Sequence, residues 1–85
     1  MEIRFNASFR KQYKKADEKI KEAFTKRLKL FQTNPRNPIL RNHQLSGKFK
    51  DYKSINITGD WRAIYIERGR VIEFQLLGTH SQLYK

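Results

Sequence analysis

The chain contains no cysteine, which excludes disulfide bonds and metal sites built from thiolates. It has only two histidines, His43 and His80, which lie far apart in the sequence without a cluster of carboxylates beside either one. A metal site needs several such ligands converging on one point. We therefore expect no metal site.

Long apolar runs are also missing. No segment approaches the roughly 20 apolar residues that span a bilayer, and the N-terminal stretch MEIRFNASFRKQ lacks the apolar region of a signal peptide. The 85 residues are 38% apolar, which is enough for one modest core and not for two. We expect a single soluble domain over residues 1–85, located in the cytoplasm and without a membrane partner.

Acidic residues are scarce, because 8 Asp and Glu face 19 Lys and Arg and leave a formal net charge of +11. A compact domain with this much like charge repels itself unless it meets a polyanion. Most of the surplus falls in residues 1–42. The expected partner is nucleic acid, the ribosome or an acidic protein.

The start of the chain has the pattern of a strand followed by a helix. Apolar and polar residues alternate in MEIRF, which indicates a short edge strand. A helix is predicted over residues 6–16, where either Asn6 or Ser8 can serve as its N-cap.

A second, stronger helix is predicted over residues 17–34. Asp17 is a candidate N-cap, apolar residues recur at helical spacing, and Pro35 forces an end. The remaining faces of both helices are rich in lysine and arginine. We interpret them as a surface that docks on a polyanion, with an ordinary solvated helix face as the alternative.

The second half of the chain has the pattern of an antiparallel sheet. A polar connection with two prolines and one glycine precedes three β-branched or aromatic runs, YKSINIT, WRAIYIE and VIEFQLLG. The predicted order is βααβββ, an α+β fold in which two helices cover one face of the sheet.

The middle run leaves the orientation of the sheet open. Alternation puts Trp61, Ala63 and Tyr65 on one face and Arg62, Ile64 and Ile66 on the other. Both sets contain apolar residues, so either one can face the helices.

Several common catalytic patterns are absent, including a glycine-rich phosphate loop and a pair of catalytic carboxylates. We therefore expect no cofactor. The remaining chemistry consists of His, Arg, Lys, Asp and aromatic side chains. This set suits RNA, because cations bind phosphates, aromatic rings stack on bases, and an imidazole can transfer protons at neutral pH.

The run HQLSGKFKDYKSINITGDWRAIY, followed by GTHSQLY, resembles the RelE/StbE-like mRNA interferase toxins of bacterial type II toxin–antitoxin systems, and within them the YafQ-like branch. The resemblance covers residues 43–84, and the N-terminal half is similar only in its helical, basic character. It implies the fold of the RelE/ParE superfamily, a single small βααβββ domain with a helical hairpin packed on a curved antiparallel sheet.

The resemblance also implies an activity and its partners. Toxins of this family cleave mRNA in the A site of the 70S ribosome, use the 2′-hydroxyl of the RNA as the nucleophile, and need no metal. A cognate acidic antitoxin neutralises each toxin in a hetero-oligomer. We expect the antitoxin to bind exposed apolar residues on the helices or on the open face of the sheet.

Four catalytic candidates follow from the resemblance. His80 resembles the general acid that protonates the 5′-oxygen, and Arg62 resembles an arginine that contacts the scissile phosphate. Asp60 matches an acidic position that acts as base or orients an imidazole, with ordinary turn chemistry in TGDW as the alternative. His43 matches a second catalytic histidine of the YafQ-like branch.

Five further residues are expected to bind RNA through cations or aromatic stacking. Core packing is the alternative for the only tryptophan. The five residues are Lys48, Lys50, Lys53, Trp61 and Tyr84.

Two positions depart from the YafQ-like pattern. Asn56 stands where those toxins usually have a histidine, and Leu76 stands where they have an arginine. An asparagine donates hydrogen bonds without shuttling protons, and a leucine can do neither. Two other functions therefore stay open: a ParE-like toxin that inhibits gyrase, and a catalytically silent module that binds the ribosome or RNA.

Overall fold

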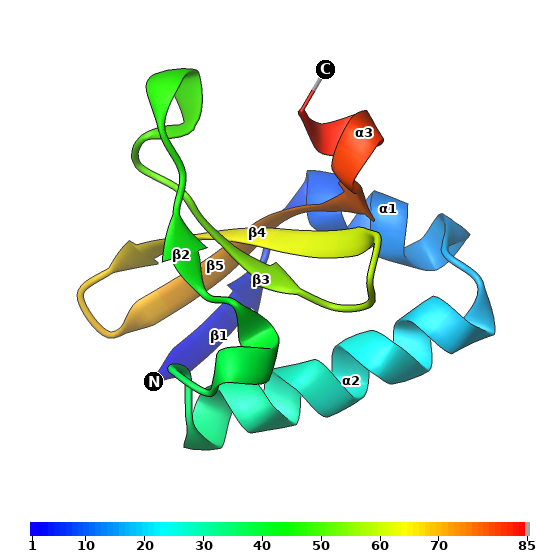
Figure 1. The fold of residues 1–85 in the computed structure, drawn as a ribbon, viewed down its shortest axis with the longest axis horizontal. Helices are drawn as coiled ribbons and strands as arrows, with labels where there is room; N and C mark the ends of the chain where they lie inside the picture. Colours follow the sequence, from blue (N-terminus) through cyan, green and yellow to red (C-terminus); the bar gives the residue numbers. More distant parts are fainter. Residues whose placement is uncertain (85) are drawn as a thin grey trace.

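The computed structural model describes residues 1–84 as a sheet with helices on both sides (Figure 1). The strands are β1 (Glu2–Phe5), β2 (His43–Gln44), β3 (Lys53–Asn56), β4 (Trp61–Arg68) and β5 (Val71–Thr79). The helices are α1 (Ala7–Lys15), α2 (Glu18–Thr33) and α3 (His80–Leu83), with 3-10 turns η1 (Pro38–Leu40) and η2 (Gly47–Phe49). The predicted α+β class and the βααβββ core are confirmed. Strand β2 and helix α3 are additions that are too short to leave a periodic pattern.

The sheet is mixed, which corrects the expectation of a wholly antiparallel one. Its strand order is β1-β5-β4-β3-β2, and β1 runs parallel to β5, with Ile3 opposite Ile72. All other pairs are antiparallel. A parallel pair needs a long crossover connection, and the path through α1 and α2 provides it. The first strand is nevertheless at the edge of the sheet, as predicted.

The two long helices begin and end at the residues that the sequence marks. The Asn6 side chain accepts a hydrogen bond from the Phe9 N–H at 2.8 Å, which resolves the choice of N-cap in favour of Asn6. Asp17 caps α2 by accepting from the Ile20 N–H at 3.0 Å. Helix α2 ends at Thr33, with Asn34 as its C-cap, directly before Pro35.

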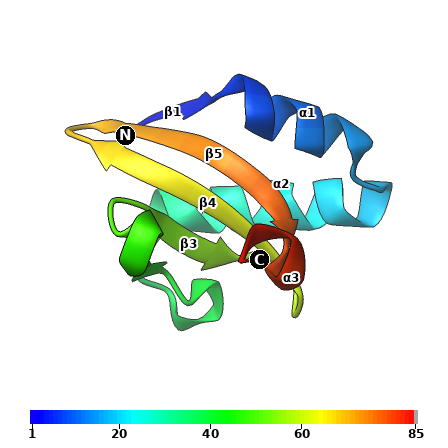
Figure 2. The same ribbon diagram turned by 90° about the horizontal axis from the view of Figure 1, so that it is seen from above.

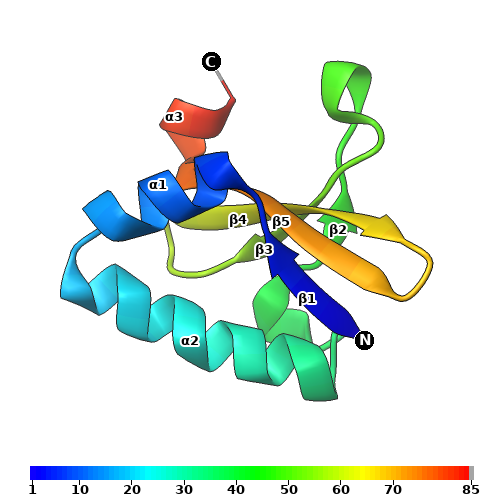
Figure 3. The same ribbon diagram turned by 180° about the vertical axis from the view of Figure 1, so that it is seen from behind.

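An aromatic core lies between the helices and the sheet. Phe9 of α1 and Phe24 of α2 meet with ring centroids 5.1 Å apart, and Phe74 of β5 packs edge-on against Phe24 at 5.5 Å. Phe31 lies 5.1 Å from the Tyr65 ring. Figure 3 shows α1 and α2 forming a hairpin, with α2 below the strands. This packing decides the orientation of β4, because the core includes Ala63 and Tyr65, with Trp61 packed against it.

The opposite face of the sheet is covered by α3. Figure 2 shows α3 and the segment around η2 on the viewer's side of the strands, with α2 beyond them. Ile64 is fully buried although it lies outside the aromatic core, and Leu83 of α3 is buried as well. A Cβ at Gly78 would lie 3.2 Å from Leu83 Cδ2, so the glycine lets α3 fold closely back over β5. None of the helices in residues 1–84 has the length and apolar character that a transmembrane segment requires.

Candidate active site

A groove of about 440 Å³ lies on the face of the sheet opposite α2. Figure 1 shows that α3 and the loop that carries η2 both rise from this side of the sheet. Side chains from four separate parts of the chain line it. They are Arg41, His43, Leu45, Asn56, Arg62, His80 and Tyr84. The groove therefore brings together four of the nine predicted site residues, including both histidines.

His43 reaches the groove from the short strand β2. It lies opposite Ser54 of β3, and its Nδ1 is 2.7 Å from the Arg41 carbonyl oxygen. A carbonyl oxygen only accepts hydrogen bonds, so Nδ1 must carry the proton and donate it. In the neutral imidazole this leaves Nε2 with its lone pair available to accept a proton.

Arg62 occupies the floor of the groove on β4. Its register neighbours are Asn56 on β3 and Gly78 on β5, so no bulky side chain stands directly beside it on β5. Its Nη1 lies 3.2 Å from the carbonyl oxygens of Thr58, Gly59 and Trp61. The turn before β4 thus holds one edge of the guanidinium in place.

His80 is the first residue of α3, and three backbone or capping contacts position it. The His80 N–H donates to the Asp60 carbonyl oxygen at 2.9 Å, and the Tyr84 N–H donates to the His80 carbonyl at 3.0 Å. Thr79 and Gln82 form a reciprocal capping box, in which each side chain accepts from the other's backbone N–H. The His80 side chain is consequently presented at the rim of the groove.

Tyr84 forms one wall of the groove. Its ring centroid is 4.7 Å from that of His80 and 6.3 Å from that of Phe49, which it meets edge-on. Its hydroxyl lies 3.4 Å from Ser54 Oγ. The ring is partly exposed, so one face of it can stack on a base.

Five of the nine predicted residues do not line the groove, and Trp61 and Asp60 are two of them. Trp61 is on the helix-facing side of β4 and packs against the core, which agrees with the alternative of core packing given for this residue. Asp60 is exposed in the turn before β4, and its connection to the groove is the backbone bond to His80. Neither residue lines the groove, and the predicted roles of Trp61 in RNA binding and of Asp60 as a base or as a residue that orients an imidazole stay predictions.

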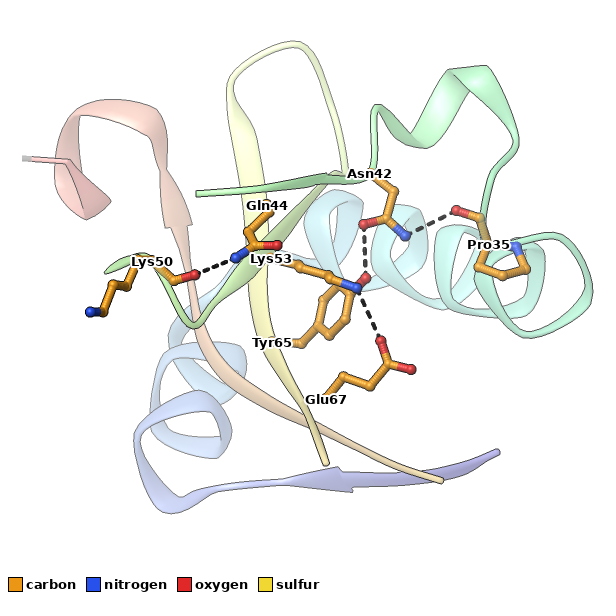
Figure 4. Close-up of polar contacts among 7 residues, drawn as sticks. All are labelled: Pro35, Asn42, Gln44, Lys50, Lys53, Tyr65 and Glu67. Carbon is orange, nitrogen blue, oxygen red and sulfur yellow. Dashed lines mark hydrogen bonds and ion pairs between the residues drawn. The ribbon is translucent and has the colours of Figure 1, made fainter. Parts of the chain in front are cut away.

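Lys53 also lies on the helix-facing side of the sheet. Figure 4 shows its side chain directed towards Glu67, and Nζ lies 3.1 Å from Oε1. Lys53 does not line the groove. In the same cluster the Tyr65 hydroxyl donates to Asn42 Oδ1 at 2.8 Å. Burial raises the pKa of Tyr65 to about 12, and the charge of Glu67 adds to this shift.

Lys48 and Lys50 project from the loop that forms one side of the groove. Both side chains are exposed, and Lys48 Nζ lies 5.3 Å from the centroid of the Phe49 ring. The Lys50 carbonyl accepts from Gln44 Nε2 at 2.6 Å, which ties the loop to β2. These two lysines add positive charge near the groove without lining it.

Arg41 is the lining residue that the sequence analysis missed. It stands two residues before His43 in the polar connection, and no motif or periodicity in the sequence marks it. Its conformation is left-handed and not extended, so the alternation of a strand could not have placed it beside His43.

The groove is electropositive. Its lining contains two arginines and two histidines and no acidic residue, and none of the ion pairs within residues 1–84 involves these four residues. No group of three or more His, Asp or Glu side chains in the described part of the chain could hold a metal ion. The arrangement can bind a phosphate and exchange protons with groups attached to it.

Comparison with known proteins gives relatives over the whole chain. The chain is 25% identical over 87 residues to the mRNA interferase toxin YafQ of Escherichia coli strain K12, which covers 98% of this chain and 95% of the relative. The crystal structure of YafQ from E. coli strain BL21(DE3) matches with a TM-score of 0.85 at 23% identity, covering 99% of this chain and 98% of that one.

The YafQ chain of the E. coli DinJ–YafQ complex matches with a TM-score of 0.71 at 24% identity, covering 99% of this chain and 98% of that one. At these identities the two structures establish the fold. The family model described as bacterial toxin of type II toxin–antitoxin system, YafQ, matches residues 1–85. The chain therefore belongs to the YafQ family of bacterial type II toxin–antitoxin toxins.

Proposed function

We propose that this protein is a ribosome-dependent endoribonuclease that cleaves mRNA through the RNA's own 2′-hydroxyl and so inhibits translation. The observation that carries the proposal is the groove in which His43 and His80 flank Arg62. The protein's membership of the YafQ family and the name of its E. coli relative, an mRNA interferase toxin, support the same activity.

His43 is the proposed general base. Its Nδ1 proton is engaged by the Arg41 carbonyl, so Nε2 of the neutral ring is free to take the proton from the 2′-hydroxyl. The 2′-oxygen then attacks the adjacent phosphorus. This assignment replaces Asp60 as the base, because the groove lining includes His43 and not Asp60.

His80 is the proposed general acid. It donates a proton to the departing 5′-oxygen, so the reaction leaves a 2′,3′-cyclic phosphate on one fragment and a 5′-hydroxyl on the other. Arg62 stabilises the negative charge that develops on the phosphate oxygens between the two histidines. A cation held in place before the reaction starts stabilises this charge at little reorganisation cost.

Asn56 and Leu76 are the two departures from the YafQ-like pattern, and only Asn56 lies where it can contact the RNA. Asn56 lies in register with Arg62 and lines the groove, where its amide can donate a hydrogen bond to a phosphate. Leu76 lies in register with Ile64, is half-buried and does not line the groove. Phosphate binding therefore falls to the arginines that remain.

The proposal includes partners and a location. The substrate is mRNA in the A site of the 70S ribosome, and the activity resides in one domain spanning residues 1–85 in the cytoplasm. A cognate acidic antitoxin holds the toxin inactive in a hetero-oligomer. The YafQ of E. coli has been seen in such a complex with DinJ, and the charge of +11 on this chain suits an acidic partner.

Primer extension on a translated reporter mRNA tests the proposal. Purified protein is compared with and without ribosomes, and beside the variants His43→Gln and His80→Gln. We expect cleavage only with ribosomes, and a loss of about 100-fold or more in each variant, which is typical for removing a general acid or base.

Two outcomes contradict the proposal. If both variants cleave at the parental rate, the roles assigned to the histidines are wrong. If the parent cleaves nothing while it still inhibits translation or gyrase supercoiling, the protein is a binding-only toxin, and Asn56 and Leu76 become the explanation.

A further inference from the structure

Arg41 has an unusual backbone conformation. Its φ of 45° and ψ of 44° place it in the left-handed region, and it is the sole non-glycine residue with positive φ in the described part of the chain. This region costs an ordinary residue free energy because Cβ approaches the backbone, whereas glycine enters it freely. A glycine at this position would relieve the strain, yet the chain carries an arginine.

Contacts on both sides of Arg41 hold it in this conformation. Its N–H donates to the Pro38 carbonyl at 3.1 Å, and its own carbonyl accepts from His43 Nδ1 at 2.7 Å. The next residue, Asn42, is fixed by the Tyr65 hydroxyl at 2.8 Å and by the Pro35 carbonyl at 3.0 Å. All of these contacts use the backbone or a neighbour's side chain. The arginine side chain itself is not needed to hold the turn.

The Arg41 side chain lines the groove and is exposed. Neither an ion pair within residues 1–84 nor a side-chain hydrogen bond in that range engages its guanidinium. Arg62 differs, because three backbone carbonyls already occupy its Nη1. Arg41 therefore offers the groove a complete set of guanidinium donors, which match the oxygens of a phosphate in pairs.

Arg41 and Arg62 are separated across the sheet. Arg41 lies two residues before His43, the first residue of β2, and Arg62 is on β4, with β3 between the two strands. Two strand spacings amount to about 10 Å of backbone separation. The two arginines are thus placed to contact different phosphates of one RNA strand.

We propose that Arg41 binds a backbone phosphate of the RNA next to the scissile one, and that the chain retains a strained arginine here for this purpose. The inference rests on the proposed function, because it names a further substrate contact of the same groove. It also explains how the groove holds RNA although Leu76 supplies no cation.

The experiment compares Arg41→Asn and Arg41→Gly with a matched control, Arg36→Asn. Asparagine and glycine both tolerate the left-handed region, so neither variant should disturb the turn. Arg36 is an exposed arginine of the same connection that lines the helix-facing side of the sheet. Ribosome-dependent cleavage and thermal unfolding are measured for each protein. Binding of a labelled single-stranded RNA is measured at about 50 and 200 mM salt.

We expect both Arg41 variants to lose about tenfold in cleavage and in RNA affinity, with a salt dependence shallower by about 0.7 in log–log slope, the value for one lost phosphate contact on a single strand. Arg41→Gly should melt at the parental temperature or higher, since it removes strain. Arg36→Asn should cleave as the parent does.

Unchanged cleavage and an unchanged salt slope in both Arg41 variants would overturn the proposal while leaving the parent's nuclease activity established. A loss of cleavage that follows a lower melting temperature in Arg41→Gly would also overturn it, because the arginine would then serve the fold. If the parent itself cleaves nothing, the proposed function fails, and the RNA-binding comparison alone decides the role of Arg41.

Discussion

At the scale of single residues, Tyr65 connects the core to the segment that presents Arg41 and His43. Its ring packs against Phe31 and Phe74 in the core, and its hydroxyl holds Asn42, which lies between those two groove residues. Tyr65 as a whole residue is only 2% exposed, and a phenolate there would lose much of its hydration. The neutral form is therefore strongly favoured in the folded protein.

The stability of the protein should depend on this residue in alkaline solution. Burial raises the pKa of Tyr65 to about 12, above the ordinary value of 10.0. A raised pKa gives a contribution that is complete below pH 10 and is lost as the pH rises towards 12, because only the unfolded chain releases the proton in that range. The parent should lose about 2 to 3 kcal/mol of unfolding free energy through this group, measured by urea denaturation at each pH.

Tyr65→Phe should lack that part of the decline. Tyr52→Phe serves as the control, because Tyr52 is partly exposed in the loop around η2 and should leave the alkaline decline unchanged. A Tyr65→Phe curve that falls in parallel with the parent between pH 10 and 12 would contradict the argument.

At the scale of elements, α3 depends on the rest of the molecule for its existence. A helix of four residues is not stable by itself, because nucleation costs more than so few hydrogen bonds return. Leu83 packs over Gly78, and the Asp60 carbonyl holds the first turn through the His80 N–H. The position of His80 is therefore a consequence of how closely α3 approaches β5.

Adding one methyl group at Gly78 should loosen α3. The new Cβ would lie 3.1 Å from Gln82 Oε1 and 3.2 Å from Leu83 Cδ2, so Gly78→Ala should cost about 1 kcal/mol of unfolding free energy through overpacking. It should also speed hydrogen exchange at the His80 and Tyr84 amides. Gly59→Ala is the control, because nothing lies within 4 Å of a Cβ at that position.

Equal stability and equal amide protection in the two glycine variants would show that α3 tolerates the extra group. The close approach of α3 to β5 would then not be what positions His80.

At the scale of the whole molecule, few of the positive charges that make up the net charge of +11 are paired with acidic side chains of the protein itself. The described part of the chain contains four ion pairs, and each of them includes at least one exposed side chain, so the pairs contribute little to stability. A polyanion gains affinity from such a surface wherever it binds. For binding to be specific, cations near the groove must contribute more to the affinity than cations elsewhere on the surface.

A charge-matched comparison separates placement from total charge. Lys48→Gln with Lys50→Gln removes two charges beside the groove, and Lys11→Gln with Lys14→Gln removes two from exposed positions of α1. We expect the first pair to weaken binding to ribosomes by about tenfold more than the second at 0.15 M salt, measured by sedimentation. Equal losses in the two double variants would mean that total charge alone drives binding.

More of the fold than of the candidate site could be predicted from the sequence. Helix boundaries at Asn6, Asp17 and Pro35 were predictable because caps and proline act locally. The parallel pairing of β1 with β5 was not, because strand direction depends on where the helical crossover delivers the chain. In the site, the resemblance identified both groove histidines and Arg62, whereas Trp61 and Lys53 turned out to lie on the helix-facing side.

The sequence by itself determined the basic surface, helices α1 and α2, the four longer strands and which residue types are available for chemistry, because these depend on local periodicity and composition. The family followed from the resemblance of its motifs and from the match to the family model. The tertiary structure alone decided which face of β4 meets the helices, how α3 folds over Gly78, and that Arg41 joins His43, Arg62 and His80 in one groove. Alternation in a strand defines two faces and leaves the choice between them to packing. Contacts between distant segments make that choice, and here the aromatic core makes it by taking Ala63 and Tyr65 and leaving Arg62 outside.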